Sequence, residues 1–94
     1  MNAIVTAMQI TTYTKKLMNV KNMVRSDKAL WFDISISGKR GPFKVEITMG
    51  HNDSYIVKLM KLNKKLEIEV MAVREMVFVE QLNNTLQRLV LVGW

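Results

Sequence analysis

Twenty residues near the middle of the chain decide its fold: LWFDISIS (30–37), GKRGP (38–42) and FKVEITM (43–49). In the two outer runs every second residue is apolar, which places the apolar side chains on one face of a strand and the polar ones on the other. The five residues between them contain two glycines, which adopt unusual φ values, and a proline, which donates no hydrogen bond to a ladder. The stretch therefore predicts a β-hairpin with one apolar and one polar face.

Further strands are expected on the C-terminal side of this hairpin. Residues 55–62 predict a third strand after a turn at 50–54, and residues 66–73 alternate well enough to predict a fourth. A bulge or turn at 74–75 is expected before a short run at 76–79. Together with the hairpin, these segments predict an antiparallel sheet built from neighbouring strands.

The two ends of the chain give less regular patterns. Residues 4–14 are rich in β-branched side chains and predict a strand, and the apolar spacing over 17–24 predicts a short helix after it. Near the other end, Asn83-Asn84 predicts a turn and residues 89–92 a final buried strand. A short helix beginning near Thr85 is the alternative for that last segment.

Length and composition place the chain in a mainly β class, with a β-rich α+β fold as the variant. Ninety-four residues fit one domain, 1–94. We expect a small antiparallel sheet or OB-like barrel of about five to seven strands, with at most one or two short helices.

The chain lacks the residues and motifs on which most enzyme active sites depend. The chain has no cysteine and one histidine, and it lacks the phosphate-binding, dinucleotide-binding and nucleophile-elbow motifs. His51, Asp53 and Ser54 lie within one turn, whereas a catalytic triad assembles from separate elements. Glu67 and Glu69 share a strand face, which is typical of a solvated surface. We therefore expect no enzyme, cofactor or metal site; a small basic ribonuclease, with His51 beside Lys58 or Arg74, is a minor alternative.

The net charge of +6 favours a polyanionic partner, because eight of the basic residues but only two acids precede residue 46. Aromatic side chains beside cations are typical of surfaces that stack unpaired bases and hold phosphates. We expect a non-enzymatic protein that binds nucleic acid, with single-stranded DNA or RNA favoured over duplex. The predicted contacts are two aromatic platforms and five cations: Tyr13, Trp31, Lys15, Lys16, Lys39, Arg40 and Lys44.

The alternative function is that of a structural or adaptor subunit of a larger assembly, such as a virion, a ribonucleoprotein or an inhibitor complex. Met71, which we expect to alternate outward, and Trp94 at an apolar terminus are the candidates for contacts between chains. A homo-oligomer or an assembly partner would cover them. With no membrane-length apolar run and no secretory leader pattern, we expect an intracellular location, in the cytoplasm or a host-cell cytoplasm.

Overall fold

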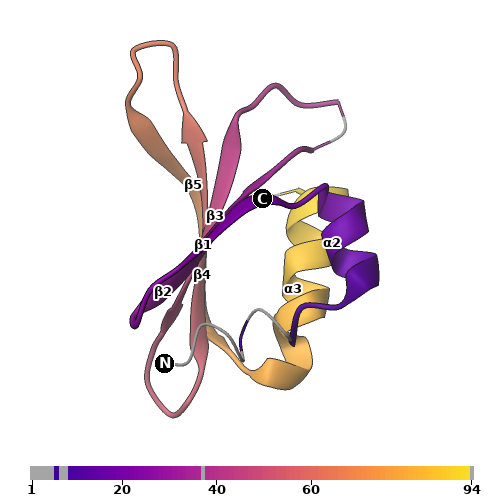
Figure 1. Cartoon of the computed structure of the whole chain (residues 1–94), viewed down its shortest axis with the longest axis vertical. Helices are drawn as coiled ribbons and strands as arrows, with labels where there is room; N and C mark the ends of the chain where they lie inside the picture. Colours follow the sequence, from indigo (N-terminus) through magenta and orange to yellow (C-terminus); the bar gives the residue numbers. More distant parts are fainter. Residues whose placement is uncertain (1–5, 7–8, 37, 94) are drawn as a thin grey trace.

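The computed structural model describes residues 6, 9–36 and 38–93. Among the described residues from Thr12 to Leu91, two helices flank five strands (Figure 1). In order, the elements are α2 (Thr12–Met18), β1 (Lys21–Arg25), β2 (Ala29–Ile34), β3 (Phe43–Met49), β4 (Tyr55–Leu62), β5 (Ile68–Val77) and α3 (Val79–Leu91).

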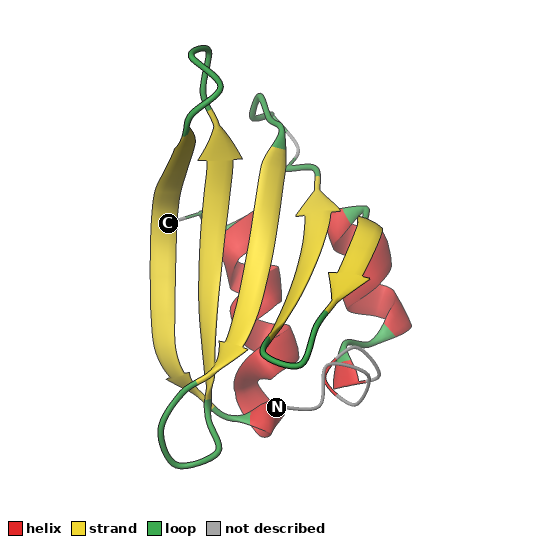
Figure 2. Ribbon diagram, turned by 60° about the vertical axis from the view of Figure 1, so that its left-hand side comes forward, coloured by secondary structure: helices red, strands yellow, loops and turns green. Residues whose placement is uncertain are grey.

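The strands form one antiparallel sheet whose spatial order, β1-β2-β3-β4-β5, is their order in the sequence (Figure 2). Both helices lie on the same side of this sheet (Figures 1 and 2). We call the sheet face beneath the helices the helix face and the opposite one the open face. β1 and β5 are the two edges of the sheet, so each has a strand neighbour on one side only.

The predicted hairpin is confirmed as β2 and β3, and its apolar residues supply the centre of the core. In the register of the pair, Leu30 lies opposite Ile47 and Phe32 opposite Val45, and all four side chains are fully buried. The third strand, predicted at residues 55–62, is confirmed as β4 with the same bounds. Alternate residues of these strands point at the helices, which is why the helix face is the apolar one.

The C-terminal segment is helical, so the predicted turn at 83–84 and the predicted strand at 89–92 are wrong. Leu82, Leu86 and Leu89 are buried at a spacing of four and three residues, which is one face of a helix rather than of a strand. Asn83 does not form a turn. Its side chain accepts a hydrogen bond from the backbone N–H of Thr11 and donates one to the carbonyl of Gln9, each at 2.8 Å.

The N-terminal prediction is reversed in the residues that the structure describes. A helix covers 12–18, where part of the strand was expected, and β1 covers 21–25, where part of the helix was expected. Local capping explains the helix: the Thr11 hydroxyl accepts from the backbone N–H of Thr14, and Asn19 ends the helix in a left-handed conformation. These caps and the burial of Met18 outweigh the β propensity of the threonines.

The expected class, a small mainly β protein with an antiparallel sheet and at most two short helices, is confirmed. Of the two arrangements expected, the described residues form the open sheet rather than a closed OB-like barrel. The runs predicted at 66–73 and 76–79 belong largely to one long strand, β5. Its pairing with β4 shifts near residues 74–77, where a bulge or turn was expected.

Replacing a core leucine of α3 tests how strongly this helix holds the sheet. We expect Leu86→Ala to lower the free energy of unfolding by about 2–5 kcal/mol, because it removes a fully buried side chain and leaves a cavity. Urea unfolding followed by circular dichroism measures the change. Leu91→Ala, on the same helix but 64 % exposed, is the matched control and changes stability by less than about 0.5 kcal/mol.

Candidate nucleic-acid interface

Trp31 lies on the open face, as the alternation predicts, and its indole is held by a carboxylate. It stands between Val24 of β1 and Glu46 of β3 in the sheet register. Its Nε1–H donates a 2.8 Å hydrogen bond to Oε2 of Glu46, and the side chain is half-buried. The ring is therefore fixed in place, with a negative group at its polar edge.

The cations beside Trp31 are charge-compensated. Lys44 Nζ lies 3.5 Å from Oδ1 of Asp33, and Lys58 Nζ lies 4.0 Å from Oε1 of Glu46. Asp33 also accepts a 2.9 Å hydrogen bond from the side chain of Asn22. Exposed pairs of this kind contribute little to stability, but they offset the local field that a phosphate would meet. The centre of the open face is therefore only weakly positive.

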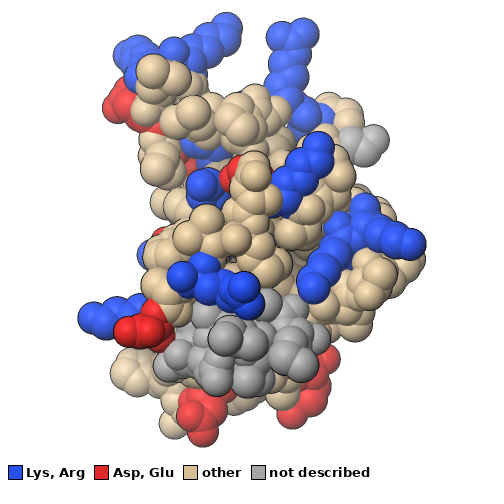
Figure 3. All heavy atoms as spheres, in the orientation of Figure 1, with Lys and Arg blue, Asp and Glu red and all other residues tan. Residues whose placement is uncertain are grey.

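Exposed cations gather instead at one end of the sheet, where the β2–β3 and β4–β5 loops project (Figures 1 and 2). Exposed Lys39 and Arg40 lie in the first loop, and exposed Lys64 and Lys65 lie in the second. Basic side chains extend from both loops into solvent in the space-filling view (Figure 3). We call this region, formed by residues 38–44 and 60–69, the loop end.

Hydrogen bonds give the β4–β5 loop a defined shape. The Asn63 side chain accepts from the backbone N–H groups of Lys65 and Glu67, both at 2.9 Å, and the backbone N–H of Asn63 donates to the carbonyl of Glu67. The two loops are joined where they leave the sheet, because the N–H of Leu62 donates to the carbonyl of Pro42 at 3.2 Å. The lysines at the tips are thus presented from a built turn rather than from a loose chain.

A groove of about 320 Å³ lies at the base of the two loops. Its walls combine apolar and cationic side chains: Asp33, Pro42, Phe43, Lys44, Met60, Lys61, Leu62 and Ile68. The ammonium of Lys61 lies 5.9 Å from the centroid of the Phe43 ring, a cation–π geometry. The volume of the groove falls at the lower end of the range typical of small-ligand sites.

The remaining predicted contacts lie elsewhere. Tyr13, Lys15 and Lys16 belong to α2, which covers the helix face, whereas Trp31 and Lys44 point from the open face. Tyr13 is 65 % exposed and makes no platform beside Trp31. The seven residues predicted from the sequence therefore fall into three groups: the three residues of α2, Trp31 on the open face, and the loop-end cations Lys39, Arg40 and Lys44.

Lys64 and Lys65 were missed by the sequence reasoning. Residues 63–65 were recognised only as a polar turn between two predicted strands. In an antiparallel sheet, consecutive strands run in opposite directions. The β2–β3 turn and the β4–β5 turn must therefore lie at the same end of the sheet. That rule, applied to the two basic turns, was the signal that brings them together.

The residues considered for catalysis do not converge. The Ser54 hydroxyl is fully buried and donates to the carbonyl of His51, so it serves the β3–β4 turn. Lys58 lies on the open face and Arg74 on the helix face, as their partners Glu46 and Val57 indicate. Among the described residues there is no group of three or more histidine, aspartate or glutamate side chains suited to a metal ion.

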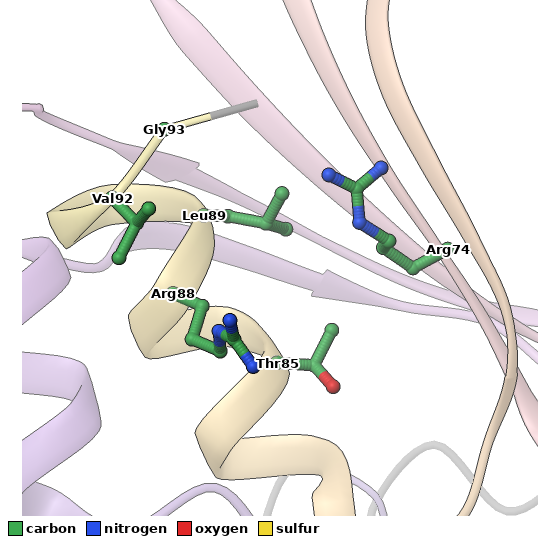
Figure 4. A pocket seen from close by; sticks show the side chains of 6 residues that line it. All are labelled: Arg74, Thr85, Arg88, Leu89, Val92 and Gly93. Atoms are coloured by element: carbon green, nitrogen blue, oxygen red, sulfur yellow. The ribbon is translucent and has the colours of Figure 1, made fainter.

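A second hollow, of about 280 Å³, lies between β5 and the C-terminal part of α3 (Figure 4). Arg74 of β5 and Arg88 of α3 line it, together with Thr85, Leu89, Val92 and Gly93. The guanidinium group of Arg74 extends toward the helix across this hollow (Figure 4). The hollow is on the helix side of the molecule and shares no lining residue with the groove at the loop end.

Comparisons of the chain with protein-family models, curated proteins and solved structures found no significant match. Within the described part of the chain, none of the helices has the length and apolar character needed to cross a membrane. The function is therefore argued from the geometry of the molecule alone.

Glu46 joins Trp31 to Lys58, so its removal tests the description of the open face. We expect Glu46→Ala to lower the free energy of unfolding by about 1–2 kcal/mol, because the indole N–H of Trp31 loses the carboxylate that accepts its hydrogen bond. Chemical denaturation gives the value. Glu67→Ala, which removes an exposed carboxylate in the β4–β5 loop, is the control and stays within about 0.5 kcal/mol of the wild type. Equal stability of both variants would contradict the Trp31–Glu46 bond.

Proposed function

We propose that this protein binds single-stranded nucleic acid at its loop end. The observation that carries the proposal is the projection of two cation-bearing loops from the same end of one sheet, with a partly apolar groove at their base. Exposed lysine and arginine side chains contact phosphates, and apolar side chains in a groove contact the faces of unpaired bases.

The charge at the loop end supports this placement. Six cations are found there, namely Lys39, Arg40, Lys44, Lys61, Lys64 and Lys65. Three carboxylates lie near them: Asp33, which pairs with Lys44; Glu69, which accepts a 3.0 Å bond from the Asn63 side chain; and Glu67. Half of the net charge of the chain is thus concentrated in two loops and the strand ends beside them. A concentrated positive field steers a polyanion toward that end.

A single strand suits this surface better than a duplex. The groove is lined by Met60, Leu62 and Ile68, and such apolar side chains contact base faces that a duplex keeps stacked and hidden. Lys44 and Lys61 flank the same groove and are within reach of a backbone passing over it. The seven-residue α2 packs against the sheet face, which leaves no free recognition helix among the described elements.

The proposal revises the surface expected from the sequence. It keeps Lys39, Arg40 and Lys44 as phosphate contacts and adds the lysines of β4 and of the second loop. Trp31 is left out as a stacking platform, because Glu46 holds its indole and would repel a phosphate placed beside it. DNA and RNA share the phosphates and base faces used in this argument, and the titrations below compare the two.

Paired alanine substitutions test the role of each loop. We expect Lys39→Ala/Arg40→Ala and Lys64→Ala/Lys65→Ala each to weaken binding and to flatten the salt dependence by about 1.4 in log–log slope, since two phosphate contacts are lost. Fluorescence anisotropy of labelled single-stranded DNA, single-stranded RNA and duplex, at several salt concentrations, gives these slopes. We expect the single strands to bind more tightly than the duplex.

Lys15→Ala/Lys16→Ala is the matched control, because it removes the same charge from α2 on the helix side. It should lower affinity only slightly and leave the slope nearly unchanged. If all three pairs reduce binding equally, the attraction is generic to the net charge and the loop end is not a site. If the wild type binds none of the three nucleic acids, the proposal fails.

A substitution of Trp31 separates the loop end from the open face. We expect Trp31→Ala to bind single strands with the wild-type affinity, because the indole lies outside the proposed site. The same anisotropy titration measures it. A loss of about 1–3 kcal/mol of binding free energy with an unchanged salt slope would instead indicate base stacking on Trp31.

A further inference from the structure

The two edges of the sheet differ in how well they suit pairing with another strand. β1 is five residues long, ends in Lys21 and Arg25, and contains an irregularity at Asn22, which has a positive φ of 53°. Short, charged and irregular edges are the usual protection against pairing. β5 is ten residues long and carries exposed apolar side chains, with Ile68 66 % and Val70 55 % exposed.

One extra residue reverses the alternation of β5 near its middle. Val70 lies opposite Met60 and Ala72 lies opposite Leu59, so Met71 has no partner of its own in β4. Val70 is on the open face and Ala72 on the helix face, and the half-buried Met71 packs against the core from the helix face. Met71 does not alternate outward as expected from the sequence, because the extra residue turns it toward the helices.

Within residues 69–74 of β5, before the second register shift of the strand, the order of faces is the same when read from either end. Residues 70 and 73 belong to the open face, and residues 69, 71, 72 and 74 belong to the helix face. A two-fold axis perpendicular to the sheet, passing between Met71 and Ala72, therefore places each residue of 69–74 opposite a residue of the same face. Directly opposed residues in an antiparallel pair must share a face, and neighbouring registers break this match.

We propose that two copies of this chain associate through β5, in antiparallel register about the point between Met71 and Ala72. Val70 of each copy then lies opposite Val73 of the other on the open face, so two exposed apolar pairs are covered. Cross-strand apolar pairs are the usual source of stability between neighbouring strands. The symmetric arrangement is isologous and closes at two copies.

Charge complementarity selects the same register. On the helix face it places Glu69 of each copy opposite Arg74 of the other, giving two ion pairs. Among the described residues, Arg74 Nη1 donates to the carbonyl of Val73, at 3.1 Å, and Glu69 accepts from the side-chain amide of Asn63. The ion pairs formed within the described part of the chain involve neither group. Both are therefore available to a second copy.

This association meets the proposed nucleic-acid site at one end of β5, where Ile68 lines the groove and Glu69 belongs to the loop end. Ile68 is at the loop end of β5 and Val77 at the other, so antiparallel pairing directs the two loop ends in opposite directions. Each copy keeps the cations of its own loop end. Dimerisation can therefore be measured without nucleic acid, and its outcome does not depend on whether the loop end binds.

Reversal of the two charges tests the register. Sedimentation velocity and light scattering at up to about 100 µM protein should show the 10.9 kDa chain converting to twice that mass in a concentration-dependent way. Arg74→Glu or Glu69→Arg alone places like charges opposite each other twice and should weaken the dimer about tenfold or more. The double variant Glu69→Arg/Arg74→Glu restores both pairs and should dimerise like the wild type.

Arg25→Glu, on the β1 edge, is the matched control and should leave the dimer unchanged. Circular dichroism of each variant shows whether the sheet is retained, and the restoring double variant separates lost pairing from lost folding. A wild-type chain that stays monomeric over the whole range overturns the proposal. So does a double variant that remains as weak as the single ones, or an oligomer that Arg25→Glu disrupts.

Discussion

The structure depends on the burial of one face of the sheet. The strands β2, β3 and β4 carry fully buried side chains such as Phe32, Val45 and Leu59 at alternate positions, all pointing the same way. Each is worth about 1.5–3 kcal/mol when removed from water, so a cover over this face is required for folding. Leu82, Leu86 and Leu89 of α3 and Met18 of α2 provide that cover.

Because α2 and α3 both cover the helix face, the solvent-exposed groups of the sheet lie on its open face, at its edges and at its ends. On the open face, neighbouring strands satisfy one another through the Trp31–Glu46 bond and the Lys44–Asp33 pair. The ends of the sheet have no such neighbours. Cations placed in hairpin turns there face solvent instead of a carboxylate on an adjacent strand, which is why positive charge accumulates at the loop end rather than beside the tryptophan.

The sequence predicted the secondary structure correctly where the pattern of apolar and polar residues was local and repeated. The alternation in residues 30–49 and 55–62 predicted three strands, because each has one buried and one solvated face. It failed where tertiary contacts decided the outcome: Leu82, Leu86 and Leu89 form one buried helix face only if the helix runs through the asparagines that suggested a turn.

The site was predicted in part for the same reason. Residue types and turns identified Lys39 and Arg40, and the alternation placed Trp31 on the solvated face. The strand order was not readable from the sequence, and the rule that alternate turns of an antiparallel meander lie at the same end was not applied to the 38–42 and 63–67 turns. Nor did composition indicate that Tyr13, Lys15 and Lys16 belong to a helix on the far side of the sheet.

The long strand β5 shows how much one residue can decide. Without an extra residue, a strand that pairs antiparallel with its own copy must place a single residue on the two-fold axis, and the charges at 69 and 74 would then not face each other. Met71 moves the axis between two residues and brings Glu69 into line with Arg74. A bulge within an edge strand usually disturbs pairing. Here the order of open-face and helix-face residues is the same on both sides of the bulge. The bulge therefore disfavours other registers and other strands, and it favours pairing with β5 of a second copy.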